Sequence, residues 1–345
     1  MAKVVLHIGT HKTATTTIQD MFAHNAALLA RHGLIYPKLG RTTGHHGLAM
    51  DWNRLPAIYE LPGSSLDNLR RIAQAHAGSP HTVFLSSEEF SRGDAKARVD
   101  FTALRGALQA FDEIEVICVL REQWQFIQSI YLEISKFRVP LRPPQLVETV
   151  LKDDMIEGLW TDYALLLDHL RVSFAPSEIT FFDYDQLRRT PGGIIGGLLA
   201  HLRVPLDPAA LVTVNGGRSN ISPGPLPTWA ANVVAEPKLA PAWLIEATTG
   251  AFGAQFGDQA QGCLWTRDEF RSLQDYARSR NDRLAAALAP QQPGFAVSQS
   301  APGEPAVYRE DMQAGFWLRS NRWTFATIQN AGQKAKPAAG QARRS

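Results

Sequence analysis

Four short apolar runs in the chain are typical of buried parallel strands. They cover residues 4–8, 81–85, 114–120 and 178–182, and the run 114–120, IEVICVL, is the most continuous, so we expect a central strand there. Strands that alternate with helical patterns predict an α/β fold with a central, mainly parallel sheet. Besides the helix after residue 13, the expected helices are 66–77, 104–111, 124–137, 146–151, 160–170, 194–202 and 266–288.

The first apolar run leads into GTHKTATTT, residues 9–17. We expect residues 9–13 to turn the chain into an amphipathic helix. A helix N-terminus offers unpaired N–H groups and partial positive charge to an anion. We interpret the stretch as a phosphate or sulfate site; the alternative is a set of threonines that only cap the helix. Lys12 adds a full charge, and the hydroxyl groups come from Thr13, Thr15, Thr16 and Thr17.

This loop differs from the commonest phosphate loop, GxxxxGK[ST]. Lys12 follows Gly9 by three residues, no glycine stands directly before it, and the threonines come after it. A nucleoside triphosphatase also needs an aspartate at the end of a neighbouring strand to hold magnesium. The candidate strand 114–120 ends instead in Arg121. The pattern therefore argues against a nucleoside triphosphatase.

Acidic residues follow the second predicted strand directly. Ser86, Ser87, Glu88 and Glu89 come after the run 81–85. Because α/β sheets bind ligands outside the carboxyl ends of their strands, these side chains lie where a ligand is expected. A helix N-cap with acids that complement the dipole explains the same residues. The two interpretations can coexist.

The segment 39–55 is rich in glycine, threonine and histidine and has no clear period. We expect a mobile loop that can cover a site. His45 and His46 are adjacent within it, and neighbouring side chains rarely converge on one metal. A surface position or a contact with an acceptor is therefore favoured over metal ligation.

An arginine follows the predicted strand 114–120, and a serine comes eight residues later. Arg121 and Ser129 can meet on one side of this strand-to-helix junction, because eight residues span about two helical turns. A guanidinium fork and a hydroxyl group can hold an anion together. The alternative is an Arg121 that pairs with Glu122 or Glu133, together with a surface serine.

Composition narrows the range of functions. The chain has 345 residues, of which 45% are hydrophobic and 20% charged, which suits one large core or two smaller ones. A net charge of +2 makes no case for nucleic acid, and the last fifteen residues supply it, with four basic residues and no acid. Cys118 and Cys263 are expected to be buried free thiols.

The ends of the chain suggest a cytoplasmic protein. The first strand begins within four residues of the N-terminus, which leaves no room for a secretory signal, and no run of about 18 apolar residues predicts a membrane span. Residues 290–305 predict a linker, and the composition beyond residue 330 predicts disorder. We therefore expect an α/β domain over 1–290, a linker and extension over 291–330, and a disordered basic tail over 331–345.

Two motifs in this order resemble the sulfotransferase family that uses 3′-phosphoadenosine 5′-phosphosulfate (PAPS). GTHKTATTT, residues 9–17, is similar to the family's 5′-phosphosulfate loop, and LREQWQFIQS, residues 120–129, is similar to its 3′-phosphate motif. FDYDQL, residues 182–187, is similar to a strand-end segment of the family. The stretches LIYP and SSEEF resemble bacterial members of the carbohydrate-type branch. The resemblance covers roughly residues 3–288.

The resemblance implies a P-loop-like, three-layer α/β/α fold and transfer of a sulfuryl group to an acceptor hydroxyl, on a carbohydrate in the branch named. Lys12 and the loop N–H groups would stabilise the leaving phosphate oxygen. Glu88 would take the acceptor's proton, with Glu89 and His46 as alternatives. PAPS would be the co-substrate, and no metal would be needed. The residues that would bind PAPS are Gly9, His11, Lys12, Thr13, Ala14, Thr15, Thr16, Arg121, Ser129 and Arg218.

The chain departs from the family's pattern in two places. Ala14 stands where many members have glycine, so we expect φ below zero there. An arginine-lysine-glycine segment is missing from the sequence, and Arg218, in the glycine- and proline-rich loop 215–227, would substitute for it or remain a solvated charge. A non-catalytic nucleotide-binding protein of the same fold and a P-loop-type kinase remain alternatives.

Overall fold

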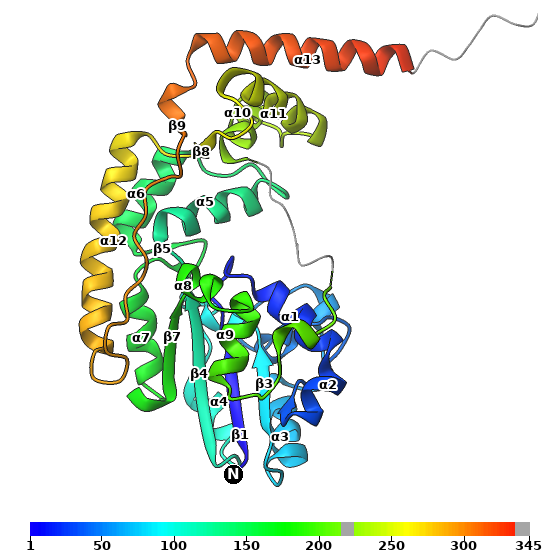
Figure 1. The fold of residues 1–345 in the computed structure, drawn as a ribbon, viewed down its shortest axis with the longest axis vertical. Helices are drawn as coiled ribbons and strands as arrows, with labels where there is room; N and C mark the ends of the chain where they lie inside the picture. The colour runs from blue at the N-terminus through cyan, green and yellow to red at the C-terminus, as the bar shows by residue number, and fades with distance from the viewer. Residues whose placement is uncertain (215–223, 335–345) are drawn as a thin grey trace, which may run out of the picture. The chain divides into compact units, whose positions relative to one another are not determined.

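The central strand of the sheet is the first one in the chain. In this computed structural model, which describes residues 1–214 and 224–334, β1 (Lys3–His7) lies between β3 (Thr82–Ser86) and β4 (Glu113–Leu120). The edges are β2 (Leu34–Ile35) and β7 (Ile179–Asp183), and all neighbours are parallel in the order β2-β3-β1-β4-β7 (Figure 1). The expected parallel sheet is confirmed.

The strand register brings the carboxyl ends of three neighbouring strands together. His7, the last residue of β1, lies opposite Ser86 at the end of β3 and opposite Ile117 in β4. After β1 the chain runs to β2 on one side of the sheet, and after β3 it crosses to β4 on the other side of β1. Open α/β sheets bind ligands at such a switch in strand order. The loops after β1, β3 and β4 are therefore the expected site.

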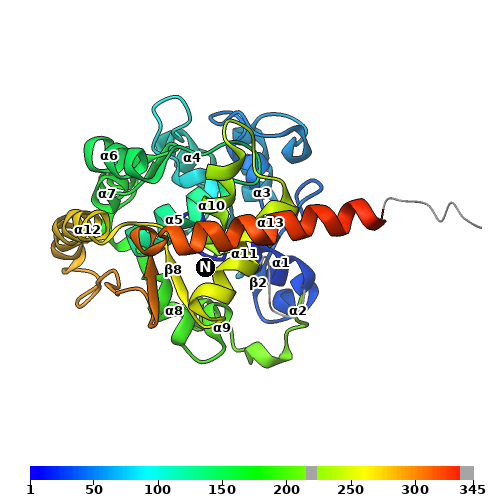
Figure 2. The ribbon, with the colours of Figure 1, turned by 90° about the horizontal axis from the view of Figure 1, so that it is seen from above.

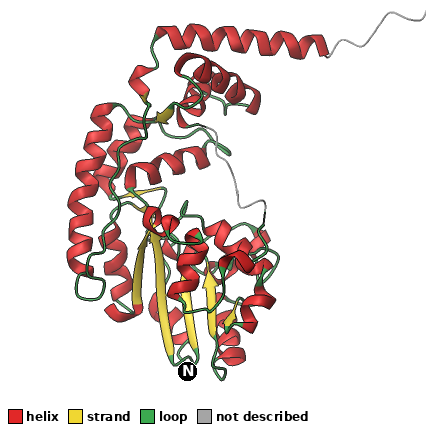
Figure 3. Ribbon diagram, in the orientation of Figure 1, coloured by secondary structure: helices red, strands yellow, loops and turns green. Residues whose placement is uncertain are grey.

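Helices cover both faces of this sheet, because successive strand residues point to opposite sides. Val4 and Leu6 belong to one buried apolar cluster, and Val5 belongs to the other. The first cluster includes residues of α3 (Ser65–His76), α4 (Phe101–Ala107), α7 (Tyr163–Arg171) and the end of α12 (Arg267–Leu288). The second includes residues of α1 (Thr15–His24), α2 (Ala26–Arg31), α8 (Tyr184–Arg189) and α9 (Gly193–His201). The three-layer α/β/α arrangement is confirmed (Figure 3).

The chain forms two compact units. The first contains Met1–Phe126, Glu148–Asn220 and Leu273–Gln299, and so holds the five-stranded sheet. The second contains Ile127–Val147, Ile221–Ser272 and Ser300–Ser345. In the second unit, helix α11 (Ala242–Phe256) packs against α10 (Pro225–Ala235) and α13 (Ala314–Lys334), and β8 (Gln261–Cys263) pairs in parallel with β9 (Ala306–Tyr308).

The remaining elements are short or connect these parts. None of the helices within residues 1–214 and 224–334 is long and apolar enough to cross a membrane. The other helices and strands are η1 (His46–Ala49), η2 (Ala57–Tyr59), η3 (Glu88–Ser91), α5 (Gln123–Ile134), α6 (Pro143–Asp153), β5 (Met155–Ile156), β6 (Leu159–Trp160), η4 (Pro176–Glu178), η5 (Pro208–Ala210) and η7 (Arg309–Asp311).

Residues 290–305, expected as a linker, contact the sheet in their first half. The side-chain amide of Gln292 both donates to and accepts from the backbone of Phe181 in β7, at 2.9 Å each. The hydroxyl and N–H groups of Ser298 donate to the carboxylate of Asp183 at 2.6 and 2.8 Å. Val297 is buried in the apolar cluster of the sheet. Polar side chains make most of these contacts, so a search for apolar runs does not detect them.

Candidate functional site

The loop after β1 is held against β4 by backbone hydrogen bonds. Ile8 N–H donates to the carbonyl oxygen of Ile117 at 2.9 Å, and Thr10 N–H donates to that of Val119 at 2.8 Å. The Thr13 hydroxyl donates to the Thr10 carbonyl at 2.5 Å, so the loop also closes on itself. These contacts fix the path of the chain from the strand into helix α1.

Two non-glycine residues of this loop have left-handed backbone conformations. Lys12 has φ 61° and Ala14 has φ 62°. The expectation of a negative φ at Ala14 was wrong: the position keeps the geometry for which glycine is best suited, although a side chain is present. A left-handed residue with a Cβ costs roughly 1–2 kcal/mol, which the surrounding hydrogen bonds must offset.

The first backbone N–H groups of α1 are not capped by a side chain. Ala14 is the N-cap residue and makes no side-chain capping bond, and the first turn holds no acid. Helices α3 and α4 begin differently, since Ser64 and Asp100 accept hydrogen bonds from first-turn N–H groups. The first N–H groups of any helix lack an intrahelical partner. At α1 they remain suited to an external anion.

The threonines of this motif differ in their surroundings. Thr13 and Thr15 are buried, whereas Thr16 is exposed and Thr17 is half-buried. The Thr13 hydroxyl is already used within the loop. Thr16 is therefore the more accessible of the two to a ligand.

The loop after β1 touches the loop after β3 at a glycine. Gly9 has φ +85°, and a Cβ placed on it would lie 2.8 Å from the Cβ of Glu88. Real Cβ atoms essentially never approach so closely. Only glycine therefore allows the predicted anion loop to pass directly beside Glu88.

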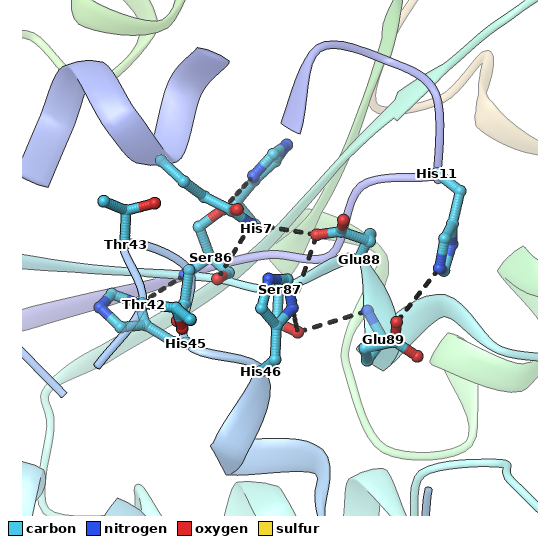
Figure 4. A network of polar contacts seen from close by, with 12 residues as sticks. His7, His11, Thr42, Thr43, His45, His46, Ser86, Ser87, Glu88 and Glu89 are labelled. Carbon is cyan, nitrogen blue, oxygen red and sulfur yellow. Dashed lines mark hydrogen bonds and ion pairs between the residues drawn. The ribbon is translucent and has the colours of Figure 1, made fainter. Parts of the chain in front are cut away.

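The segment after β3 combines the two roles that its sequence suggested. Ser87 is the N-cap of η3, and its hydroxyl accepts from the Glu89 N–H at 3.3 Å, as the capping interpretation predicts. The same hydroxyl lies 3.0 Å from Nδ1 of His46 (Figure 4). Capping and a polar cluster at the carboxyl end of the strand therefore coexist.

Glu88 lies among groups that stabilise its carboxylate. Its Oε2 accepts from the side-chain amide of Gln19 at 3.0 Å and lies 3.7 Å from Nδ1 of His46. Burial raises the pKa of Glu88, but His46, His11 and the Gln19 amide outweigh burial, and the pKa is lowered from its ordinary value. Glu88 is therefore ionised at neutral pH, which is the state that a general base requires.

Glu89 has a different set of partners, although it is the next residue. Its Oε1 lies 3.4 Å from Nε2 of His11 (Figure 4). Its Oε2 accepts from Nε of Arg92 at 2.5 Å. Burial opposes ionisation, but the bonds to His11 and Arg92 lower the pKa of Glu89 to about 2. A carboxylate that is paired this strongly is a poor proton acceptor.

The segment 39–55 is packed against the end of β3, so the expectation of a mobile loop was wrong. The N–H of His45 donates to the Ser86 carbonyl at 2.8 Å, and its ring Nδ1 accepts from the Ser86 N–H at 2.9 Å. Its Nε2 donates to the carbonyl of Pro37 at 2.7 Å. Burial lowers the pKa of His45 to about 4, so the ring is neutral and its tautomer is set by these two bonds.

His46 is buried as well, so a surface position for either histidine was also a wrong expectation. Its ring packs edge-on against Tyr59, with the ring centroids 4.7 Å apart. Gly44 leaves room for it, because a Cβ there would lie 2.4 Å from Nε2 of His46. His46 is therefore fixed between Ser87 and Gly44, at the side of Glu88.

Two residues of this cluster escaped the sequence analysis. His7 ends β1, its Nδ1 lies 2.8 Å from the Ser86 hydroxyl, and burial lowers its pKa to about 4. Gln19 donates to both Ser86 and Glu88 from the second turn of α1. The only sequence signal for His7 is a polar residue at the end of an apolar strand. Gln19 has no signal, because its role depends on strands that meet only in the fold.

Arg121 reaches back to the first loop. Its Nη1 donates to the Lys12 carbonyl oxygen at 3.4 Å, and its Nη2 donates to Oε1 of Gln125 at 3.1 Å. Its guanidinium also lies 5.3 Å from the ring centroid of Tyr184. Burial lowers the pKa of Arg121, but neighbouring Tyr184 and Asp185 act in the opposite direction.

Two predicted donor contacts are not tested by this geometry. Ser129 lies on α5 within the second unit, whereas Arg121 belongs to the first. Arg218 lies outside the described residues. Both stay predictions.

The second unit contains a cavity of its own. It has a volume of about 350 Å³ and is lined by apolar side chains of the segment 139–144, by Trp229 and by the ion pair of Arg142 with Glu236. Arg142 Nη2 donates to both carboxylate oxygens of Glu236, at 2.7 and 2.9 Å. The positive charge of Arg142 is thus neutralised by the Glu236 carboxylate.

The chain is similar to known proteins in structure but not in sequence. No protein-family model matches the chain, and the search of curated proteins gave no match either. Among similar solved structures is a sulfotransferase from Alicyclobacillus acidocaldarius, with 12% identity and a TM-score of 0.45, which covers 82% of this chain and 94% of that one. Another is mouse sulfotransferase SULT7A1 complexed with PAP, with 10% identity and a TM-score of 0.32, covering 97% and 84%.

Both similar structures are named sulfotransferases. Their identities and TM-scores are low. The residues of the chain itself carry the functional conclusion.

Proposed function

We propose that the chain is a sulfotransferase that uses PAPS to sulfate an acceptor hydroxyl. The observation that carries this proposal is the contact of Arg121 with the backbone of Lys12. It joins the two motifs that resemble the family, one after β1 and one after β4, at the carboxyl ends of these neighbouring strands. One nucleotide with an anion at each end suits such a pair of cationic groups.

The loop after β1 would hold the phosphosulfate end. The N–H groups at the start of α1 have no capping side chain, and Lys12 supplies a full positive charge beside them. PAPS supplies an activated sulfuryl group that leaves a phosphate oxygen. Lys12 and the loop N–H groups would stabilise the charge that develops on that oxygen, an effect for which one donor is typically worth about 10²- to 10³-fold in rate.

Arg121 would bind the 3′-phosphate and so distinguish this donor from adenosine monophosphate. Ser129 and Arg218 are proposed to add contacts to the same phosphate. His11, Ala14, Thr15 and Thr16 complete the proposed donor site around the first loop. This assignment needs no metal, because lysine and arginine supply the positive charge.

Glu88 is the proposed general base. The acceptor's oxygen would form a bond to sulfur while the bond from sulfur to the phosphate oxygen breaks, and the acceptor's proton would pass to the Glu88 carboxylate. The support is position and charge: Glu88 lies beside Gly9 of the donor loop and is ionised. His46 lies 3.7 Å away and can orient this carboxylate. Glu89 is the weaker candidate, because Arg92 and His11 already hold it.

A hydroxyl of a carbohydrate is the proposed acceptor, and the cytoplasm is the proposed compartment. The experiment that tests the donor assignment is titration calorimetry with adenosine 3′,5′-bisphosphate and adenosine monophosphate. The bisphosphate should bind at least about tenfold more tightly, since hydrogen bonds to charged groups contribute about 1.5–3 kcal/mol. Equal affinities would contradict the assignment.

A further inference from the structure

Helix α13 has one face packed in the second unit and one face in solvent. Figures 1 and 2 show it lying across α10 and α11, with its C-terminal half extending beyond them. Phe316 and Ser320 are buried on the packed face. The ring of Trp323 rests on Gly250 of α11, where a Cβ would lie 2.6 Å from it. The packed face therefore accounts for only part of the helix's apolar side chains.

The opposite face carries a stripe of large apolar residues. Leu318 is 61% exposed, Phe325 is 63% exposed and Ile328 is 55% exposed. Spacings of seven and three residues put these side chains on one side of a helix. Scattered exposed apolar residues are ordinary, whereas apolar residues aligned on one helix face form a candidate interaction surface.

The charge around this stripe has one sign. Residues 314–345 contain no aspartate or glutamate. Arg319 donates to the amide oxygen of Gln255 at 3.1 Å, and neither Arg319 nor Arg322 forms an ion pair with any residue that the structure describes. Helix α10 has no acid, and α11 has only Glu246. The basic residues of this C-terminal segment are Arg319, Arg322, Lys334, Lys336, Arg343 and Arg344.

We propose that α13 binds the surface of an anionic lipid bilayer and lies in the plane of its interface. A basic helix whose exposed face carries leucine, phenylalanine and isoleucine has the features of an interfacial helix. Anionic lipid complements the uncompensated arginines. A second copy of the same face would oppose like charges, so self-association is disfavoured. This inference is independent of the proposed transfer activity.

The test is co-sedimentation of the full chain with vesicles. Vesicles of phosphatidylcholine mixed with phosphatidylglycerol should bind the protein, and vesicles of phosphatidylcholine alone should bind it at least about tenfold more weakly, because each basic residue near an anionic surface adds attraction. Raising the salt from about 0.1 to about 1 M should weaken binding, since the Debye length falls from about 10 to about 3 Å.

Variants separate the stripe from general surface stickiness. The triple substitution L318S, F325S and I328S should lower vesicle binding by at least about tenfold, because buried methylene groups supply much of the affinity. The double substitution R319E and R322E should lower binding to the anionic vesicles by a similar factor. Binding to vesicles of phosphatidylcholine alone should stay unchanged. The control is Phe137→Ser, which removes an even more exposed phenylalanine, 76% accessible, outside α13. It should leave binding unchanged.

Each variant should fold, because the altered side chains are exposed. Circular dichroism and thermal unfolding check this. The proposal is overturned if the intact chain does not sediment with anionic vesicles, or if the triple variant binds them as well as the original. It is also overturned if sedimentation velocity shows a dimer that the triple substitution dissociates, because the stripe would then bind a second copy.

Discussion

The guanidinium of Arg121 donates a hydrogen bond to the carbonyl oxygen of Lys12 at 3.4 Å, although the residues lie 109 positions apart in sequence. The contact follows from the sheet, in which β1 and β4 are neighbours and their carboxyl ends adjoin. Lys12 belongs to the loop after β1, and Arg121 follows β4 directly. Two positively charged residues are thereby brought to the carboxyl ends of β1 and β4. The ionised Glu88 lies beside the first loop.

Arg121→Ala should weaken binding of adenosine 3′,5′-bisphosphate by about 10- to 150-fold, which corresponds to the 1.5–3 kcal/mol of a charged hydrogen bond. Affinity for adenosine monophosphate should hardly change, since it lacks the 3′-phosphate. Titration calorimetry measures both. Arg188→Ala is the matched control, because Arg188 also lies over the ring of Tyr184, at 5.8 Å, but is an exposed partner of Asp185. Equal losses for both ligands would refute the assigned role of Arg121.

Glu88→Gln should lower kcat for sulfuryl transfer by about 10²- to 10⁴-fold, because glutamine keeps the shape but cannot take a proton. Glu89→Gln should have a much smaller effect. Since the pKa of Glu88 is lowered, a rate that depends on its carboxylate should hold as the pH falls to about 5 and decline only below the ordinary glutamate pKa of about 4.3. Full activity of Glu88→Gln would exclude it as the base.

Gly9→Ala and Ala14→Gly should change stability in opposite directions. At Gly9 a Cβ meets Glu88 at 2.8 Å and the φ is +85°, so alanine should lower the free energy of unfolding by at least about 1–3 kcal/mol. At Ala14, with φ 62°, glycine removes left-handed strain and should leave stability unchanged or raise it by up to about 1 kcal/mol. Urea unfolding followed by circular dichroism compares them. A stabilising Gly9→Ala would show that the loop takes another path.

This pair of positions also shows how far sequence reasoning reached. The apolar runs predicted β1, β3, β4 and β7 to within one residue at each end, because buried parallel strands leave a continuous apolar signal. Glycine at position 9 was expected at a turn. The left-handed φ of Ala14 was not expected, because the path of the loop depends on non-local hydrogen bonds of Ile8 and Thr10 to β4.

The segment around His45 shows the opposite case. Its glycine and threonine content predicted a mobile loop, but the ring of His45 bonds to Ser86 and Pro37 and is buried. Polar residues that become buried leave no periodic apolar pattern to read. The same reason hid Gln19, which meets Glu88 only after α1 has packed on the sheet.

The buried histidines predict a loss of stability in mild acid. Burial lowers the pKa of both His7 and His45 to about 4, whereas an unfolded histidine titrates near 6.5. Between those values the unfolded chain binds more protons than the folded chain, so stability is full above about pH 6.5 and falls as the pH drops toward 4. Each histidine contributes at most about 1.4 kcal/mol per pH unit.

Urea unfolding at pH 7.5 and pH 5.0 measures this effect. His45→Gln should reduce the difference between the two pH values, even though it also lowers stability at pH 7.5 by removing the bonds to Ser86 and Pro37. His24→Gln, a substitution of an exposed histidine at the end of α1, should leave the difference unchanged. An unfolding free energy that does not fall between the two pH values would contradict the neutral state of both rings.

The most direct test of the central claim is transfer of label from PAPS carrying radioactive sulfur to a panel of glycans, lipids and phenols. The chain should label at least one acceptor, and Lys12→Ala should reduce that rate by about 10²- to 10³-fold with an unchanged circular dichroism spectrum. Lys38→Ala, a substitution of an exposed lysine outside the loop, is the control and should transfer label normally. Labelling of no acceptor above the level of Lys12→Ala would contradict sulfuryl transfer at this site.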